Sequence, residues 1–247
     1  LESELGKAIA LIARLPTIAA HAYAAKRHYY DNESLYLHRP QEGLGVAENF
    51  LYSVRHDNRF TEQEARLLDL CMVLHAEHGG GNNSAFACRV LSSSLTDTYS
   101  ALASAVGSLK GPRHGGANIK VVRMFEEMKE EVHDWKDDEE ISRYLARLLN
   151  KDAFDHAGLI YGVGHAVYSK SDPRAVIFKG FVEKLAHEKG REEDYQLYSA
   201  VERLAPQIIG EKRKIYKGVS ANVDFYSGFV YSMLDIPLEL YTPMFAM

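Results

Sequence analysis

The sequence predicts an all-α fold. Apolar residues recur at spacings of three and four along most of the chain, as in Leu67, Cys71 and Leu74, which places them on one face of a helix. Helix-capping residues such as Thr61 stand directly before these apolar runs. Alternation with a period of two is almost absent, and the one strand candidate, residues 159–168, is interrupted by glycines. We therefore expect packed helices without a sheet.

Composition excludes several classes of function. The 247 residues are 46% hydrophobic and 26% charged, which is typical of a globular chain with a sizeable core. The net charge is -5 without a cluster of Lys and Arg, so we expect no nucleic-acid partner. We also expect no membrane-spanning segment and no signal peptide. Cys71 and Cys88 lie in apolar helical patterns, which indicates buried thiols in a reducing, cytoplasmic setting.

The first part of the chain predicts two helical pieces and a loop. Residues 3–15 have helical spacing, and Pro16 is expected to interrupt the helix because it lacks a backbone N–H. A helix resumes over residues 18–30. Residues 31–45 contain Asn, Pro and Gly residues and are expected to form a loop. A short helix follows over residues 48–54.

Capping residues predict the next helices. Thr61 and Glu64 form a capping box, and the helix they open ends at the glycines 79–81. Ser84 is expected to cap a helix over residues 85–95, and Asp97 precedes another over residues 98–109.

The second half continues the helical pattern. A long helix after residue 117 has Val121, Met124, Phe125 and Met128 on its apolar face, and another begins at Asp138. Further helices are expected over residues 173–189, 192–214 and 225–233. In the first of these we expect four inward side chains, which are Val176, Ile177, Phe181 and Leu185.

Residues 162–174 combine three features of a binding site. Gly162 and Gly164 let the backbone turn tightly and approach a ligand closely. His165 follows them and can exchange a proton near neutral pH. Asp172-Pro173 is typical of a helix start, which places Arg174 in the first turn, where an anion is favoured. This stretch predicts a site for a carboxylated or phosphorylated small molecule.

Three further polar residues flank turns. His78 precedes a triple glycine, His114 precedes Gly115-Gly116, and Asp224 follows Asn222-Val223. His75 and His78 could simply interact with a helix end or form half of a zinc site, although no third ligand has a suitable spacing. Asp224 could act only as an N-cap.

The order of these motifs resembles the citrate synthase family. The resemblance rests on Gly162 to Arg174, on Leu74 to His78 with Asn82, on Gly111 to Asn118, and on Asn222 to Gly228. It covers essentially the whole chain. It implies a multi-helical fold with a large domain and a smaller mobile domain, an active site in the cleft between them, and a homodimer.

The resemblance also implies domain limits and catalytic roles. Residues 1–113 and 236–247 would belong to the large domain, and residues 114–235 would form the small one. Asp224 would remove a methyl proton from acetyl-CoA while His114 stabilises the enolate. His165 would protonate the keto oxygen of oxaloacetate. Water would then hydrolyse citryl-CoA to citrate and CoA.

The resemblance assigns binding residues too. His78, Asn82 and Arg174 would hold oxaloacetate. The candidate CoA-binding residues are Gly162, Val163, Gly164, Lys170 and Lys217. Family members often have a basic residue where this chain has Ser169, so Lys170 or Lys217 is the substitute for a phosphate contact. No cofactor and no metal are implied, since acetyl-CoA is a substrate.

Alternatives remain open at this point. A 2-methylcitrate synthase would use propionyl-CoA with the same motifs, a non-catalytic helical binding protein could keep the fold, and a metal hydrolase is a third class. The chain begins at Leu1 and stops in the apolar run 243–247, so we expect part of a longer protein. The resemblance places two oxaloacetate-binding arginines beyond Met247, so a protein ending there is expected to bind oxaloacetate poorly.

Overall fold

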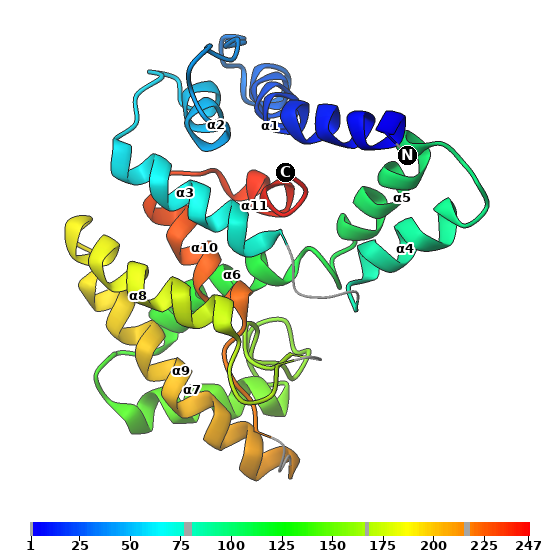
Figure 1. The fold of residues 1–247 in the computed structure, drawn as a ribbon. Helices are drawn as coiled ribbons and strands as arrows, with labels where there is room; N and C mark the ends of the chain where they lie inside the picture. The colour runs from blue at the N-terminus through cyan, green and yellow to red at the C-terminus, as the bar shows by residue number, and fades with distance from the viewer. Residues whose placement is uncertain (1, 77–80, 166–167, 215–217) are drawn as a thin grey trace. The chain divides into compact units, whose positions relative to one another are not determined.

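The computed structural model describes residues 2–76, 81–165, 168–214 and 218–247. Every regular element within these ranges is a helix, which confirms the all-α class (Figure 1). The helices are α1 (Glu2–Asp31), α2 (Val46–Val54), α3 (Glu62–His75), α4 (Asn83–Ser92), α5 (Thr98–Leu109), α6 (Ala117–Glu131), α7 (Asp138–Asn150), α8 (Pro173–Glu188), α9 (Glu192–Arg213), α10 (Val223–Met233), the 3-10 helix η1 (Leu238–Leu240) and α11 (Tyr241–Met244).

The chain divides into two compact units. Unit 1 comprises residues 1–115 and 236–247, and unit 2 comprises residues 116–235. The boundaries expected from the sequence lie after residues 113 and 235.

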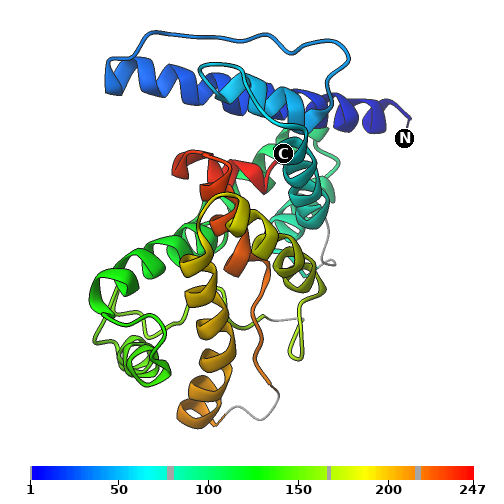
Figure 2. The same cartoon turned by 90° about the vertical axis from the view of Figure 1, so that its left-hand side faces the viewer.

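In unit 1, α1 is one continuous helix (Figure 2), so the expected interruption at Pro16 is wrong. Pro16 and Ala20 are the buried residues of α1, and we attribute the continuity to their packing, which offsets the hydrogen bond that proline removes. Among the described residues, α1 is also the one helix whose length and composition would allow it to cross a membrane. The expectation that no apolar run is long enough was therefore wrong by length and composition. Buried core helices and N-terminal signal sequences meet the same two criteria.

The start of α3 is tied to the end of α2 by one carboxylate. Thr61 caps α3 through the amide of Glu64, and the Glu64 side chain accepts from the Thr61 amide at 3.0 Å, which confirms the capping box. The same Oε2 atom accepts from Arg55 Nη1 at 2.7 Å. Glu64 is only 7% exposed, so the pair joins the two helices inside unit 1.

The hairpin of α4 and α5 corrects a second expectation. Asn82, not Ser84, caps α4, because its side-chain oxygen accepts from the amides of Ser84 and Ala85 at 2.8 and 3.0 Å. Helix α4 lies beside α5 (Figure 1), yet none of its residues is buried. Asp97 caps α5 through the amide of Ser100, as its position predicted.

In unit 2, α10 is the central helix. It packs against α6 and α8, while α9 packs against α7 and α8. Aromatic rings fill the space between these helices. Phe125 of α6 stacks on Tyr198 of α9 with ring centres 3.6 Å apart, and Tyr198 stacks on Phe229 of α10 at 4.6 Å. The apolar residues predicted for α6 are all buried.

The inward face of α8 differs from the expected one. Val176, Ile177 and Phe181 are 60%, 43% and 47% exposed, so only Leu185 of the four expected residues is buried. The buried face of α8 includes Arg174 in the first turn, so it is turned away from the face predicted from the apolar spacing. The residues that face inward are Arg174, Ala175, Phe178, Val182, Leu185 and Ala186.

Helices α6 and α10 approach each other closely at Gly228. A Cβ atom at this position would lie 2.5 Å from Val122 Cγ2 and 3.0 Å from Asn118 Oδ1. Next to it, the buried Asn118 amide donates to the Ser227 hydroxyl. The glycine therefore sets the spacing of the two helices.

Replacing Gly228 with Ala should lower the free energy of unfolding by about 1–3 kcal/mol, because the added methyl overpacks this crossing. Gly180→Ala in α8 is the matched control, since a Cβ there would have no neighbour within 4 Å. It should stabilise the protein by about 0.5–1 kcal/mol. Urea denaturation of both variants measures the difference, and equal stabilities would contradict the close crossing.

Candidate active site

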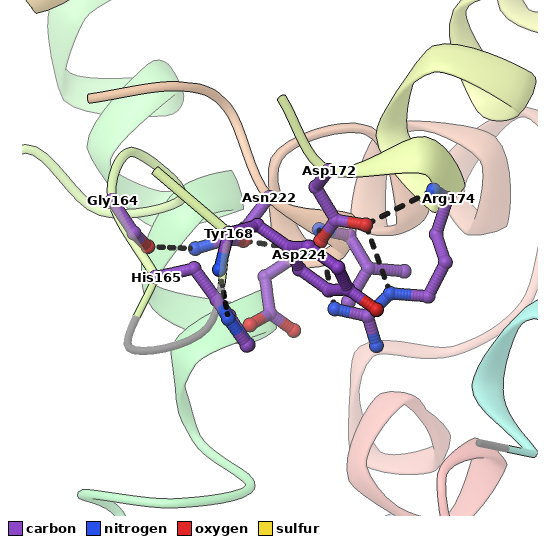
Figure 3. Close-up of polar contacts among 8 residues, drawn as sticks. Gly164, His165, Tyr168, Asp172, Arg174, Asn222 and Asp224 are labelled. Atoms are coloured by element: carbon purple, nitrogen blue, oxygen red, sulfur yellow. Dashed lines mark hydrogen bonds and ion pairs between the residues drawn. The ribbon is translucent and has the colours of Figure 1, made fainter. Parts of the chain in front are cut away.

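The glycine stretch of unit 2 is held against the start of α10. Val163 and Ala221 form an isolated antiparallel bridge. The Asn222 amide donates to Gly162 O at 2.8 Å, and its side-chain amide donates to Gly164 O at 2.7 Å (Figure 3). These bonds connect segments 58 residues apart and fix the loop relative to the helix that carries Asp224.

Glycine is required at Gly162 for two reasons. Its φ of +80° lies in the left-handed region, and a Cβ would lie 2.9 Å from Phe225 Cα and from Val121 Cγ2. Gly164 has a φ of +98° but more space, since its nearest neighbour would be Val219 at 3.6 Å. Because Gly162 has no Cβ, the backbone of this loop comes closer to α10 than it could with any other residue at position 162.

His165 follows the loop and has a defined acceptor atom. The Tyr168 amide donates to His165 Nδ1 at 3.3 Å, and the two rings are 5.1 Å apart (Figure 3). A backbone donor at Nδ1 requires that atom to be unprotonated, so the neutral ring carries its proton on Nε2. His165 can then donate a hydrogen bond from Nε2 to a substrate oxygen.

Asp172 caps α8, as the Asp-Pro start predicted, and it also pairs with Arg174. Its Oδ1 accepts from the Arg174 amide and from Arg174 Nε, both at 3.0 Å, and its Oδ2 accepts from Arg174 Nη2 at 2.7 Å. The two residues are 1% and 7% exposed. Burial alone would raise the pKa of Asp172, but the hydrogen bonds and charge of Arg174 outweigh it and hold that pKa below its usual value.

Asp224 is not the N-cap of α10, so that alternative is wrong. Asn222 caps the helix, and its Oδ1 accepts from the Asp224 amide at 2.9 Å. The Asp224 side chain is half-buried. The pKa of Asp224 is raised to about 6, mainly by desolvation. The positive charge of Arg174 lowers this pKa, and the negative charge of Asp172 raises it. A carboxylate with this pKa is ionised at pH 7 and is a stronger base than an ordinary aspartate.

Together these groups form an acid–base site within unit 2 (Figure 3). Asp224 can accept a proton near neutral pH, and His165 can donate from Nε2. Arg174 supplies a guanidinium that suits a carboxylate or phosphate. The candidate site therefore fits a reaction of an anionic substrate in which Asp224 removes one proton and His165 donates another.

Two of the predicted residues that the structure describes belong to unit 1. His114 lies in the turn before α6, and its Nε2 is 2.8 Å from the Ser84 hydroxyl. Asn82 uses its side-chain oxygen to cap α4. The contact with Ser84 was not predicted from the sequence, because a serine at a helix start is ordinarily a cap. The meeting of His114 with Asp224 and His165 stays a prediction.

The structure describes only some of the remaining predicted residues. Lys170 is exposed in unit 2. His78 and Lys217 lie outside the described residues. Within the ranges that the structure describes, no three His, Cys, Asp or Glu side chains group as a metal site. The zinc alternative for His75 and His78 is not tested by this, since it includes His78.

The described residues form an all-helical fold, and Asp224, His165 and Arg174 of unit 2 make a candidate acid–base site. The family model for the C-terminal domain of citrate synthase matches residues 2–247. A citrate synthase of Synechocystis sp. is 38% identical over 244 residues, covering 96% of this chain and 54% of that protein. A 2-methylcitrate synthase of Shewanella oneidensis is 32% identical over 235 residues, covering 95% and 56%.

Solved structures show the same relationship. Citrate synthase from Pyrobaculum aerophilum matches with a TM-score of 0.75 and 34% identity, over 94% of this chain and 52% of that one. A ternary complex of the Thermoplasma acidophilum citrate synthase with carboxymethyl coenzyme A and oxaloacetate matches with a TM-score of 0.74 and 30% identity, over 94% and 56%. The chain belongs to the citrate synthase family, and it spans about half the length of the relatives it matches.

Asp224→Asn should make the folded protein more stable at pH 7.5. The folded-state pKa of Asp224 is raised from 3.8 to about 6, so its ionised form costs stability that the neutral amide does not. The gain in Tm should therefore shrink as pH falls through 6 and vanish below about pH 3.8.

Asp194→Asn is the matched control for this test. Asp194 is also buried in unit 2, but its hydrogen bonds to Lys129 and Arg191 outweigh burial and lower its pKa. Its removal should decrease Tm at pH 7.5, with the difference shrinking as the pH falls. Calorimetry from pH 3.5 to 7.5 measures both variants, and a destabilised Asp224→Asn protein would contradict the raised pKa.

Proposed function

We propose that the protein condenses acetyl-CoA with oxaloacetate and hydrolyses the resulting citryl-CoA to citrate and CoA. The observation that carries this proposal is the carboxylate of Asp224, which has a pKa of about 6 and belongs to the same local cluster as His165 and Arg174. The relatives named citrate synthase support the choice of substrates.

In the first step Asp224 removes a proton from the acetyl methyl group. A thioester is a weak carbon acid, so the carboxylate can do this only if the developing enolate oxygen is stabilised at the same time. His114 is the proposed donor to that oxygen. The contact between His114 Nε2 and Ser84 would orient the imidazole for this role.

In the second step the enolate carbon attacks the keto carbon of oxaloacetate. His165 donates its Nε2 proton to the keto oxygen as the carbon–carbon bond forms, while Arg174 holds a substrate carboxylate. Asp172 accepts hydrogen bonds from Nε and Nη2 of Arg174, so the substrate carboxylate is expected to accept one from Nη1. His78 and Asn82 complete the proposed oxaloacetate contacts.

CoA is proposed to bind along residues 162–164. Their backbone comes close to α10 because Gly162 has no side chain, and the same property lets a flat adenine approach the loop. Lys170 and Lys217 are the proposed phosphate contacts. Water finally cleaves the thioester of citryl-CoA and releases CoA, and no cofactor is needed for any step.

The second candidate function is 2-methylcitrate synthesis from propionyl-CoA. The similarity to the Shewanella oneidensis enzyme favours it. The extra methylene of propionyl-CoA changes binding by only about 1–3 kcal/mol, so the motifs do not separate the two. The ratio of kcat/KM for acetyl-CoA and propionyl-CoA decides between them.

Asp224→Ala should reduce kcat for citrate formation by about 10²–10⁴-fold, because the general base is lost. Oxaloacetate binding, followed by calorimetry, should persist, since Arg174 is unchanged. Asp137→Ala removes the N-cap of α7 in the same unit and should leave kcat near the wild-type value. Retained turnover in Asp224→Ala would exclude the proposed base.

We propose that the protein is a cytoplasmic homodimer. The support for the dimer comes from α4, which has no buried residue although Phe86 and Val90 are apolar and 64% and 53% exposed. Apolar side chains that cluster on one exposed helix are typical of an interface.

Phe86→Glu should convert the dimer to a monomer, because it places a charge in the proposed interface. Val176→Glu is the matched control, since Val176 is 60% exposed on α8. Light scattering after size exclusion measures the mass of each variant. A monomeric wild-type protein, or a dimer unaffected by Phe86→Glu, would contradict the proposal.

A further inference from the structure

We propose that Asp172 is a positioning residue that couples the guanidinium of Arg174 to the helix that carries Asp224. The inference rests on the proposed function of this site. It gives Asp172 a role beyond capping α8, since its carboxylate would set both where the substrate anion binds and how basic the proton acceptor is.

One carboxylate joins two segments of the site. Asp172 Oδ1 accepts two hydrogen bonds from Arg174, from the backbone amide and from Nε. Its Oδ2 accepts a third from Arg174 Nη2 and a fourth from the Val223 amide at 3.2 Å. A carboxylate has about four acceptor positions, so these donors saturate it. Asp172 is 1% exposed, and solvent is therefore a poor substitute for any of the four donors.

The bond to Val223 brings Asp224 into this arrangement. Val223 is the first residue of α10, and Asp224 is the next. The amide of Asp224 is taken by the Asn222 cap, whereas the amide of Val223 is taken by Asp172, which is 51 residues away in sequence. Displacing the Asp172 carboxylate would therefore release the first turn of α10 as well as Arg174.

The charges of the pair also act on Asp224 in opposite directions. The positive charge of Arg174 lowers the pKa of Asp224, and the negative charge of Asp172 raises it. His165 lies near enough to lower the pKa of Asp172 electrostatically. Without Asp172, the effect of Arg174 on Asp224 would be unopposed.

The other helices around α10 present few charges. From α6, Asn118, Val122 and Phe125 contact α10, and none of them carries a charge. From α9, Glu202 accepts a hydrogen bond from Tyr226 and pairs with Lys179 of α8, and Arg191 lies over the Phe229 ring. These charged groups are unchanged in the two Asp172 variants below, so their effect on Asp224 is common to both.

Asp172→Asn in the full-length protein tests the coupling. The amide keeps the size of the side chain but removes its charge and turns an N–H₂ toward donors. The KM for oxaloacetate should rise about tenfold or more, because Arg174 loses its orienting partner. The acidic midpoint of the kcat/KM profile should move down by about 1 pH unit, because Arg174 acts unopposed on Asp224.

Asp172→Glu separates charge from geometry. The longer side chain keeps the negative charge but cannot hold all four donors in their present positions. Its KM for oxaloacetate should also rise, while its acidic midpoint should stay near the wild-type value. This variant also covers the case in which Asp172→Asn does not fold.

Asp194→Asn is the control for loss of a buried ion pair. It should lower Tm without changing the KM or the midpoint, because Asp194 contacts Arg191 and Lys129 and not the site. If Asp172→Asn and Asp172→Glu lower Tm in the same way and leave both kinetic values unchanged, Asp172 is only structural and the inference is overturned.

A measurement without turnover distinguishes this inference from the proposed function. Carbon-13 NMR of labelled aspartate, assigned with Asp224→Asn, reports the pKa of Asp224 in the wild-type and Asp172→Asn proteins. A lower pKa in the variant supports the coupling even if the protein does not form citrate. An unchanged pKa overturns it even if the wild-type protein is an active citrate synthase.

Discussion

The buried carboxylate of Asp172 is the interaction on which the site depends. It accepts hydrogen bonds from the backbone and guanidinium of Arg174 and from the first amide of α10. Leaving any of these buried donors unpaired would cost free energy, so the carboxylate holds the three groups in one arrangement. Arg174, the proposed anion-binding residue, and Asp224, the proposed proton acceptor, thus share one support, which explains how residues distant in sequence keep a defined geometry.

A second set of contacts joins the glycine loop to Asn222, the N-cap of α10. The backbone of residues 162–164 bonds to Asn222, whose side chain both reaches Gly164 and caps α10. Because Gly162 and Gly228 lack side chains, the loop and α6 can approach α10 at two points along its length. Asp224 is next in sequence to Phe225, against which Gly162 packs, and desolvation raises the pKa of the Asp224 carboxylate toward neutrality.

Local signals in the sequence predicted much of the fold. The caps at Thr61, Asp97 and Asp172 and the apolar face of α6 are present as expected, because each depends on residues within one or two turns. The predictions were wrong where tertiary packing overrides a local rule. Examples are the helix break expected at Pro16 inside α1 and the inward face expected for α8. The bond from Asp172 to Val223 and the contact of Ser84 with His114 join residues 51 and 30 positions apart, so a local reading of one sequence carries no sign of them.

A crystal structure of the full-length protein with oxaloacetate and carboxymethyl coenzyme A tests this arrangement most directly. We expect the keto oxygen within hydrogen-bond distance of His165 Nε2 and a substrate carboxylate on Arg174, with the Asp172 bonds intact. The Asp224 carboxylate should face the carbon that stands for the acetyl methyl group. Ligands bound away from these three side chains, or an Asp172 carboxylate turned away from Val223 in the complex, would contradict it.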